Sequence, residues 1–442
     1  MNNPVAARSL NAWLELLETR HPTAIDLGLD RCGAVWRRMG SPRPAPSIFV
    51  VAGTNGKGST VATICGLLGG LGYRYGSYTT PHLYRYNERV QLGGQPVGDE
   101  QLVAAFERVE AAREGTRLTY FEFGTLAAFA LLSEAALDHA VMEVGLGGRL
   151  DAVNLLDADV AVITPIGLDH QEYLGDDLES IGREKAGIIR PAQTVICGEQ
   201  HPPASIPAIV AQQGANLRRL GVEFHARAVA DGVRFESGGL ELDLPPPALP
   251  GPHQVGNLAT GLAAVLARIP AAAGETAGLA RGLRSVRLAG RLERVAAHPA
   301  LWIDVGHNPL AARAVAAALG QIKAAEKITA FRCVIGMLAD KDAAGAAAEL
   351  QPVIDRWYCA GLPGSRGQAA GELAARIASA VGGAPLASFA DVPTALDAAL
   401  ADSPGDQGVL VFGSFLSAAA AGNHVREAAH PPGSGAAATF DG

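Results

Sequence analysis

A glycine-rich stretch behind an apolar run is the feature that most constrains this chain. It reads Phe49-Val50-Val51-Ala52-Gly53-Thr54-Asn55-Gly56-Lys57-Gly58-Ser59-Thr60. Glycines let backbone N–H groups approach an anion, a lysine adds a point charge, and a hydroxyl can reach Mg²⁺. The stretch therefore predicts a strand, a phosphate-binding loop and a helix. Its spacing departs from the usual P-loop, because Val51 takes the place of the first glycine and Gly58 that of the Ser or Thr.

The composition favours a globular protein of two or three domains, since 442 residues exceed one ordinary core. No apolar run reaches the ~18–20 residues of a membrane span, and the first residues lack the pattern of a signal peptide. The five cysteines form no CxxC pair, which favours reduced thiols in the cytoplasm. A net charge of −8 argues against general nucleic-acid binding. We expect a cytoplasmic protein with neither a nucleic-acid nor a membrane partner.

Strand and helix patterns alternate along the chain, which predicts an α/β fold with mostly parallel, helix-covered sheets. Strands are expected at 47–52, 140–144, 160–164 and 195–197, and helices at 9–20, 30–39, 57–71, 99–114, 122–136 and 257–268. Residues 217–245 alternate differently and predict a small antiparallel patch. A second, Rossmann-like α/β alternation begins near 300, with strands near 330–335, 355–359 and 409–412. We predict domains at 1–289 and 297–422, a linker at 290–296 and a disordered tail at 423–442.

Polar side chains follow several of the predicted strands, where open α/β sheets bind ligands. Glu143 can be an oxygen ligand for Mg²⁺ or can pair with a neighbouring Arg. His170 can be a ligand or a packed residue, and Mg²⁺ prefers oxygen. On residue chemistry alone, Lys185 is a lysine on a solvated helix face. Asp304 and the segment 336–342 lie either at a site or in soluble loops.

The ordered set of motifs resembles the Mur ligase superfamily and, within it, the folylpolyglutamate synthase/dihydrofolate synthase family. The resemblance extends from the N-terminus to about residue 415. Its motifs are the glycine loop, Thr80-Pro81-His82-Leu83, Thr119-Tyr120-Phe121-Glu122-Phe123-Gly124-Thr125, Glu143-Val144-Gly145-Leu146-Gly147-Gly148-Arg149-Leu150-Asp151, Leu168-Asp169-His170, Arg183-Glu184-Lys185-Ala186-Gly187-Ile188, Asn257-Leu258-Ala259-Thr260, Gly290-Arg291, Asp304-Val305-Gly306-His307-Asn308-Pro309 and Gly336-Met337-Leu338-Ala339-Asp340-Lys341-Asp342. Gly290-Arg291-Leu292-Glu293 departs mildly, because relatives often have Phe-Gln after the Arg.

The resemblance implies an N-terminal P-loop-type ATPase domain and a C-terminal glutamate ligase domain, with ATP and Mg²⁺ as cofactors. ATP would be bound by Thr54, Asn55, Gly56, Lys57, Gly58, Ser59, Thr60, Asn257, Arg291 and Asp304. Mg²⁺ would be held by Glu143, His170 and Thr80, the last of which is often serine in relatives. Lys185 matches a lysine that is carbamylated in relatives, which implies a second Mg²⁺. Lys57, Lys185 and His307 are the expected catalytic residues, His307 as the group that positions or deprotonates the glutamate amine.

The resemblance also implies a pterin site. Its residues would be Ile25, Asp26, Leu27, Thr119, Tyr120, Phe121, Glu122, Leu150, Asp151 and Ala152. These segments favour a bifunctional ligase over a glutamate-adding enzyme alone. The expected substrates are dihydropteroate, tetrahydrofolate polyglutamates and L-glutamate, and the expected state is a monomer.

Three other functions stay open on the sequence. One is a folylpolyglutamate synthase without the dihydropteroate activity, and another is a different Mur-type ligase, such as one acting on a cell-wall precursor. The third is a nucleotide-dependent switch. The Asn-Lys-x-Asp base reader of guanine switches does not occur in the chain, and a switch would hydrolyse ATP without glutamate.

Overall fold

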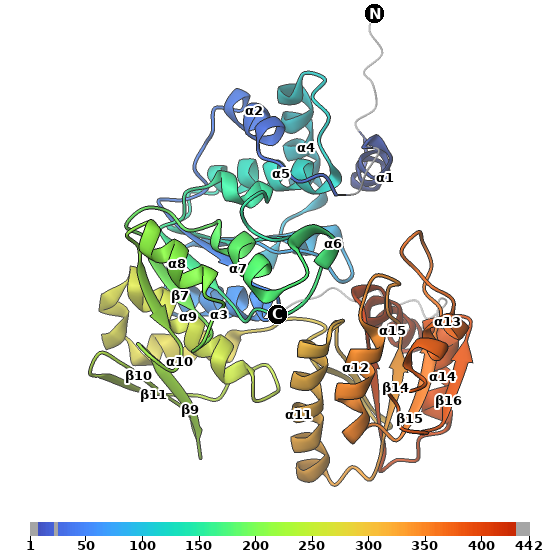
Figure 1. Ribbon diagram of the computed structural model, residues 1–442. Helices are drawn as coiled ribbons and strands as arrows, with labels where there is room; N and C mark the ends of the chain where they lie inside the picture. The colour runs from blue at the N-terminus through green and yellow to red at the C-terminus, as the bar shows by residue number, and fades with distance from the viewer. Residues whose placement is uncertain (1–7, 22–24, 430–442) are drawn as a thin grey trace, which may run out of the picture. The chain divides into compact units, whose positions relative to one another are not determined.

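The computed structural model describes residues 8–21 and 25–429, which form two compact units. Unit 1 contains residues up to Leu249 together with His253–Leu288, and unit 2 contains Pro250–Pro252 and the residues from Ala289 onward. Figure 1 shows each unit as a sheet with helices against it. The α/β fold class predicted from the sequence is confirmed.

Unit 1 is built on a mostly parallel sheet whose strand order is β4-β3-β2-β5-β1-β6-β7-β8. Its strands are β1 (Ser47–Ala52), β2 (Tyr75–Tyr78), β3 (Val90–Leu92), β4 (Gln95–Pro96), β5 (His139–Glu143), β6 (Val160–Ile163), β7 (Thr194–Cys197) and β8 (Asn216–Arg219). β3 and β4 pair antiparallel at one edge. The predicted antiparallel patch is confirmed for β9 (His225–Val229), β10 (Gly232–Ser237) and β11 (Leu240–Leu244). The prediction was wrong for residues 217–219, which belong to β8 and pair parallel with β7.

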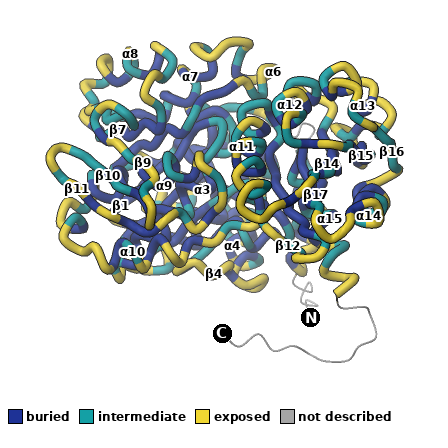
Figure 2. The backbone as a smooth tube through the Cα atoms, turned by 90° about the horizontal axis from the view of Figure 1, so that it is seen from below, coloured by how far each residue is buried: buried dark blue, intermediate teal, exposed yellow. Residues whose placement is uncertain are grey.

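The helices of unit 1 are α1 (Leu10–Arg20), α2 (Asp30–Arg38), α3 (Lys57–Gly70), α4 (Asp99–Arg113), α5 (Tyr120–Glu134), α6 (Gln171–Leu174), α7 (Leu178–Ala186), α8 (Ser205–Gln212), α9 (Gln254–Arg268) and α10 (Thr276–Ser285). They form two layers because successive side chains of a strand point to opposite faces. Val50 of β1 belongs to the core that includes α1, α2, α4 and α5, whereas Val51 belongs to the core of α3, α9 and α10. Figure 2 shows the buried backbone concentrated around β1, α3 and α9.

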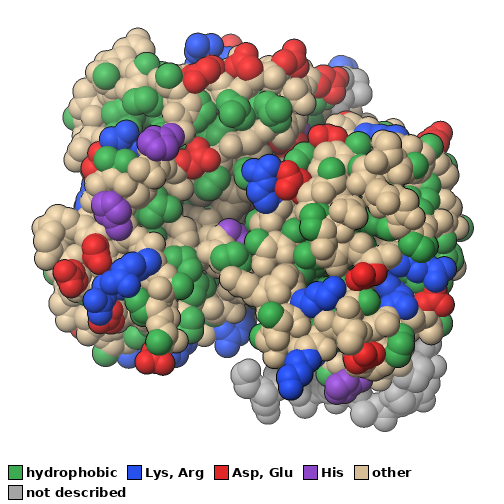
Figure 3. Space-filling model, turned by 60° about the horizontal axis from the view of Figure 1, so that its bottom comes forward, with side chains coloured by type: hydrophobic (Ala, Val, Ile, Leu, Met, Phe, Trp, Pro, Cys, Tyr) green, Lys and Arg blue, Asp and Glu red, His purple; other side chains and the backbone are tan. Residues whose placement is uncertain are grey.

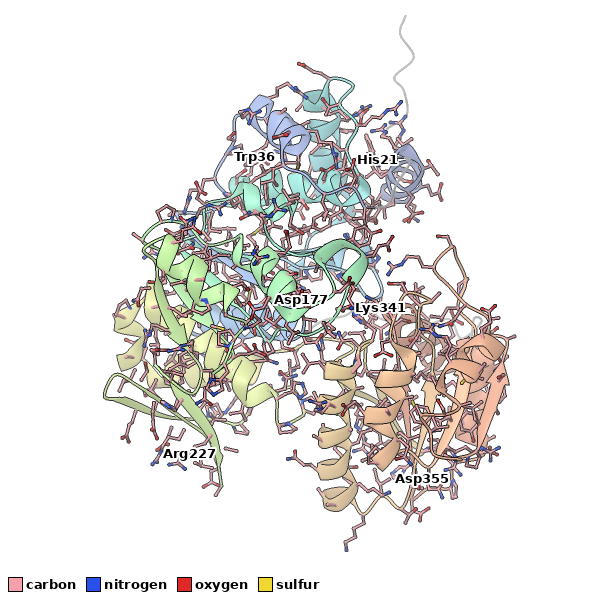
Figure 4. The ribbon with its side chains drawn as sticks, viewed as in Figure 1. His21, Trp36, Asp177, Arg227, Lys341 and Asp355 are labelled. Atoms are coloured by element: carbon pink, nitrogen blue, oxygen red, sulfur yellow. The ribbon has the colours of Figure 1, made fainter. Side chains whose placement is uncertain are left out.

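Local sequence explains where several of these helices begin. Thr119 and Glu122 form a capping box at α5, in which each side chain accepts a backbone N–H of the other residue. Asp177, labelled in Figure 4, accepts the Ser180 N–H at the start of α7. Trp36 of α2 packs edge-on against Phe129 of α5, with ring centroids 5.0 Å apart. The N-terminal helices are thereby fixed against the sheet that carries the glycine loop.

Unit 2 has a six-stranded sheet over its described residues, with the order β12-β13-β17-β14-β15-β16. Its strands are β12 (Glu293–Ala297), β13 (Ala300–Ile303), β14 (Phe331–Ile335), β15 (Arg356–Ala360), β16 (Leu386–Phe389) and β17 (Gly408–Phe412), and its helices are α11 (Pro309–Glu326), α12 (Ala343–Leu350), α13 (Ala370–Ile377), α14 (Val392–Ala401) and α15 (Phe415–Ala429). Only β12 runs antiparallel.

Two sequence expectations were wrong in unit 2. Residues 293–296 of the predicted linker belong to the edge strand β12, which pairs with β13 because Ala297 and Ala300 flank a tight turn. Residues 423–429 of the predicted tail continue α15, since Arg426, Glu427 and the alanines after them are good helix formers. The rest of that predicted tail lies outside the described residues.

All five cysteines are buried and none forms a disulfide. Among residues 8–21 and 25–429, no helix has the length and apolar character needed to cross a membrane. On the face shown in Figure 3, basic and acidic side chains are interspersed.

Candidate functional site

The glycine loop is held against the segment that follows β6. The N–H groups of Thr54 and Asn55 donate to the carbonyl oxygen of Pro165 at 3.0 and 3.3 Å, and the Thr54 hydroxyl lies 3.0 Å from both the N and the O of Gly167. The loop therefore has a defined shape at the carboxyl ends of two adjacent central strands, β1 and β6. This edge is where open parallel sheets bind ligands.

Two glycines of the loop exclude a side chain. Gly53 has φ of +148°, and a Cβ atom there would lie 1.8 Å from Thr164 Oγ1. Gly56 has φ of +84°, and its Cβ would lie 2.5 Å from Asn257 Oδ1. Asn257 lies on α9, about two hundred residues later in the chain, so the structure brings this predicted nucleotide residue to the loop. It is buried and donates to Gln254 at 2.9 Å.

The other loop residues begin α3. Gly58, Ser59 and Thr60 occupy its first turn and are buried. The Thr60 N–H donates to the Gly56 carbonyl at 2.9 Å, and the Thr60 hydroxyl is buried with no hydrogen-bond partner among the described residues. The N-terminus of a helix with its backbone N–H groups attracts anions.

Two lysine ammonium groups converge on one carbonyl of the loop. Lys57 Nζ lies 3.2 Å from the Gly53 oxygen, and Lys185 Nζ lies 2.8 Å from the same oxygen. Burial, and next the nearby Lys57 charge, lower the pKa of Lys185 to about 7, whereas Asp169 and Asp151 oppose the shift. Lys185 is thus no solvated surface residue. The Lys57 ammonium and the backbone N–H groups at the start of α3 together suit a multiply charged anion such as a phosphate chain.

The strand-end carboxylates have different partners. Glu143, which is buried at the end of β5, accepts the Thr80 N–H at 3.3 Å. Asp151 accepts the backbone N–H groups of Gly145, Leu146 and Val153 at 2.9–3.0 Å. Burial raises the pKa of Asp151 to about 6, although these bonds act in the opposite direction. Asp151 therefore holds the backbone of the loop after β5 in place. Glu143 and Thr80 lie in contact where β5 ends and this loop begins.

Two members of the predicted metal set are in contact, since the Thr80 backbone N–H donates to Glu143. A threonine hydroxyl and a carboxylate are oxygen ligands of the kind that Mg²⁺ prefers. His170 precedes α6 in a left-handed conformation with φ of +52°, and its backbone N–H donates to Asp169 at 2.9 Å. Within residues 8–21 and 25–429, no group of three or more His, Cys, Asp or Glu side chains is arranged to hold a metal.

The residues expected to bind a pterin lie around the N-terminus of α5. Glu122 is buried, and its Oε2 accepts from Arg31 Nε at 3.0 Å, while its Oε1 has no hydrogen-bond partner among the described residues. Arg31 also donates to Asp26 at 2.6 Å. Such a buried acceptor atom fits an N–H donor of a heterocycle. The remaining members are Ile25 and Leu27, half-buried before α2, Thr119 at the cap, Tyr120 and Phe121 in the first turn of α5, and Leu150 and Ala152 beside Asp151.

In unit 2, the predicted residues lie at the end of β13. Asp304 is buried and accepts the N–H groups of Leu292 and Gly306 at 2.8 and 2.7 Å. Burial raises its pKa, although the Arg291 charge opposes the shift. The Arg291 guanidinium lies 5.5 Å from the ring centre of Phe415. His307 Nδ1 lies 3.0 Å from the Val305 carbonyl oxygen, so Nδ1 carries a proton and donates it to this bond.

Several residues of the site were not predicted from the sequence. The glycine loop is held in place by Thr164, Pro165 and Gly167. The sequence motif that follows β6 could have predicted these residues. The buried Arg89 donates to the half-buried His82 at 3.0 Å beside the Thr80 segment. His82 belongs to a quoted motif, but nothing in the sequence distinguishes Arg89 from a surface arginine.

Known proteins resemble the chain along nearly its whole length. Residues 51–265 match the Mur ligase middle domain, and residues 290–415 match the Mur ligase glutamate ligase domain. A dihydrofolate synthase/folylpolyglutamate synthase of Escherichia coli strain K12 is 45% identical over 426 residues, which are 96% of each chain. The protein of the same name from Mycobacterium tuberculosis is 38% identical over 375 residues, which are 77% of this chain and 75% of that one.

Solved structures resemble the chain in the same way. An Escherichia coli FolC structure in complex with DHPP and ADP has a TM-score of 0.89 and 43% identity, covering 97% of this chain and 100% of that one. A bifunctional folylpolyglutamate synthase/dihydrofolate synthase from Yersinia pestis, complexed with AMPPNP and a Mn ion, has a TM-score of 0.86 and 42% identity with the same coverage.

Proposed function

This chain belongs to the dihydrofolate synthase/folylpolyglutamate synthase family of Mur ligases, and from that membership we propose how its residues carry out the reaction. It is an ATP-dependent ligase that joins L-glutamate to dihydropteroate and to folates. Its cofactors are ATP and a divalent metal ion. The two domain roles, the cytoplasmic location and the monomeric state predicted from the sequence are parts of the proposal.

The reaction needs an activated acid. A carboxylate is a poor acyl donor because oxide would have to leave, so transfer of the γ-phosphoryl group from ATP to a carboxylate oxygen gives an acyl phosphate and ADP. The amine of L-glutamate then attacks the acyl carbon, and inorganic phosphate leaves with the C–O bonding electrons while the nitrogen loses a proton. The protein contributes positioning and charge neutralisation.

The observation that best supports this proposal is the Lys57 ammonium, which lies 3.2 Å from the Gly53 carbonyl oxygen at the start of α3. Lys57 would hold the β- and γ-phosphates together with the loop N–H groups, and Asn257 would contact the nucleotide beside Gly56. Thr80, Glu143 and His170 would hold the metal ion, which supplies charge neutralisation when bound. In unit 2, Arg291 and Asp304 would contact ATP, and His307 Nε2 would accept the proton of the glutamate amine.

Lys185 is proposed to react with carbon dioxide. A lysine with a pKa of about 7 is largely a neutral amine at slightly alkaline pH, and a neutral amine adds CO₂ to give a carbamate and one proton. The carbamate would supply oxygen atoms for a second Mg²⁺. This role is supported by the burial of Lys185 and by its 2.8 Å hydrogen bond to the Gly53 carbonyl oxygen of the glycine loop.

A coupled assay tests the function. Purified protein with ATP, Mg²⁺, dihydropteroate and L-glutamate should release ADP only when both acceptor and glutamate are present, and a new amide should be found by mass spectrometry. Repeating the assay with tetrahydrofolate distinguishes the bifunctional enzyme from a folylpolyglutamate synthase. Glutamate-independent ATP hydrolysis without an amide product would instead identify a nucleotide switch, and activity with a cell-wall precursor another Mur-type ligase.

The Lys57→Ala variant gives the assay a residue-level outcome. Loss of one electrostatic stabiliser of this kind costs about 3 kcal/mol of barrier, so kcat/KM should fall by at least ~100-fold while the unfolding midpoint stays close to that of the parent. A variant that ligates at the parental rate would remove the loop from the mechanism.

A further inference from the structure

Arg89 is a buried cation without a carboxylate partner. It ends the short 3₁₀ helix Tyr86–Arg89 and is 7% exposed. Among the described residues, no Asp or Glu forms an ion pair with its guanidinium, whereas the less deeply buried Arg20, Arg31 and Arg113 of unit 1 each pair with a carboxylate. A buried charge is costly unless an opposite charge compensates it.

The neighbours of Arg89 are neutral. Its Nε donates to His82 Nδ1 at 3.0 Å, and its guanidinium lies 5.0 Å from the ring centre of Tyr86 and 5.4 Å from that of Tyr120. Because His82 Nδ1 accepts this hydrogen bond, it carries no proton, and the ring is neutral. Aromatic rings compensate a cation only in part.

Some donors of the guanidinium have no hydrogen-bond partner among the described residues. Arginine has five N–H donors, and His82 and the Tyr78 hydroxyl account for only part of them. In the part of the chain that the structure describes, no nitrogen of Arg89 is both sealed from solvent and without a partner. The nitrogens without a partner therefore keep some contact with solvent.

Arg89 lies next to residues of both the proposed metal site and the proposed pterin site. Its carbonyl oxygen accepts the Thr79 N–H at 2.8 Å, next to Thr80 and its contact with Glu143. On its other side lies Tyr120, in the segment assigned above to the pterin. Arg89 thus contacts both regions, with its backbone at the segment that carries Thr80 and with its guanidinium at Tyr120. The carboxylate end of a pteroate-type acid has to lie between the proposed metal ligands and the proposed pterin site.

We propose that Arg89 binds a carboxylate of the acceptor through its guanidinium N–H groups. The inference rests on the proposed function and adds a recognition residue to it. Guanidinium is suited to this task because its planar fork matches the two oxygens of a carboxylate. The carboxylate has two sources, namely the aryl carboxylate of pteroate, or the α-carboxylate of the glutamyl residue that folates carry.

Binding measurements on the full-length protein test this proposal with three probes: pteroate, folate and 6-methylpterin, which has no carboxylate. Arg89→Met should weaken pteroate and folate binding by at least tenfold if the aryl end is bound, or folate binding alone if the glutamyl α-carboxylate is bound. In both cases 6-methylpterin should bind as to the parent. Equal loss for all three probes, or no loss for any, would overturn the proposal.

The unfolding midpoint is a second measurement. Replacing a ligand-binding Arg89 and replacing a purely structural Arg89 should change this midpoint in opposite directions. Because Arg89 has no counter-ion, Arg89→Met should leave the unfolding midpoint of the ligand-free protein unchanged or raise it, whereas a structural arginine would lower it. Arg294→Met is the matched control, since Arg294 lies 5.2 Å from the ring centre of Trp302 but pairs with Glu326 at 3.1 Å. It should lower the midpoint without changing pteroate binding.

Two further measurements keep the outcomes separate. If Arg89→Met does not fold, Arg89→Lys keeps the charge but loses the fork, and it should show an intermediate loss of affinity; parental affinity in that variant would contradict the proposal. If the parent itself binds neither pteroate nor folate, the proposed function fails, whereas binding by the parent and equally by Arg89→Met refutes only the role of Arg89.

Discussion

Two glycines with the same backbone conformation have very different surroundings. Gly56 and Gly72 have φ values of +84° and +83°, a region that costs other L-residues about 1–2 kcal/mol. A Cβ at Gly56 would lie 2.5 Å from Asn257 Oδ1, while a Cβ at Gly72 would meet no atom within 4 Å. Comparing Gly56 with Gly72 therefore distinguishes the effect of backbone strain from the effect of the contact between the loop and the Asn257 amide.

Gly56→Ala and Gly72→Ala should therefore cost similar stability and differ in nucleotide binding. Each should lower the unfolding free energy by about 1 kcal/mol. Only Gly56→Ala should weaken ATP binding, by at least tenfold, because its methyl group displaces the Asn257 amide. Titration calorimetry with ATP, together with thermal unfolding, measures both effects. Equal ATP affinity in the two variants would show that the Gly56–Asn257 contact has no role in binding.

The buried ammonium of Lys185 should make stability depend on pH. Its pKa is about 7 in the folded protein against an ordinary 10.5. Below pH 7 both the folded and the unfolded chain hold the proton, and the full cost of burying the charge is present. Between 7 and 10.5 only the unfolded chain keeps it, so stability rises with pH, and above 10.5 the cost is absent.

Lys185→Met removes that cost. The variant should unfold at a higher temperature than the parent near pH 7, and the difference should shrink as the pH rises toward 10. Thermal unfolding in carbon-dioxide-free buffers from about pH 6 to 10 measures it, and added bicarbonate should reduce the difference if a carbamate forms. A difference that does not change with pH would contradict the burial of a charged Lys185.

At the level of elements, α3 and α10 approach closely because both present glycines. Gly66 and Gly70 of α3 lie against Gly278 and Gly282 of α10, and a Cβ at Gly282 would lie 2.2 Å from the Gly66 carbonyl oxygen. The obstacle is backbone, which cannot rotate away. The helix that begins at the nucleotide loop is thus packed along its length against the last helix of unit 1.

Gly282→Ala should separate these two helices and destabilise the protein by about 1–3 kcal/mol. Gly320 of α11 is the matched helical control, since a Cβ there meets no atom within 4 Å, and Gly320→Ala should stabilise by up to about 1 kcal/mol. Chemical denaturation of both variants measures the change in unfolding free energy, which should be negative for Gly282→Ala and positive for Gly320→Ala. A neutral Gly282→Ala would show that α10 moves freely relative to α3.

The sequence predicted elements better where the pattern is local. β1, the glycine loop and α3 were predicted because an apolar run, glycines and a helical period are all local signals. The short strands β2, β8 and β16 were not, since they are partly polar and become strands only by pairing with neighbours. The contact of Gly56 with Asn257 and the neutral surroundings of Arg89 come from residues far apart in the chain, so composition and period carry no signal for them.

At the scale of the whole molecule, the hydrophobic cores divide as the two units do. The cores of unit 1 use residues between Leu10 and Leu283, and the core of unit 2 uses residues between Leu292 and Phe412. No described residue belongs to a core of both. Each unit therefore has the packing that an independent domain needs.

Fragments of the chain should show this division. Residues 289–429 should fold alone, because that fragment contains its complete core and falls within the usual domain size of roughly 50–250 residues. Residues 8–288 should fold as well, whereas residues 8–249 should not, since they lack α9 and α10, whose leucines and valines cover one face of β1 and β6. Amide NMR dispersion and a cooperative thermal transition identify the folded fragments. If the 8–249 fragment were as stable as 8–288, α9 and α10 would be dispensable for the sheet that carries the nucleotide loop, and the close packing at Gly282 would have no energetic weight.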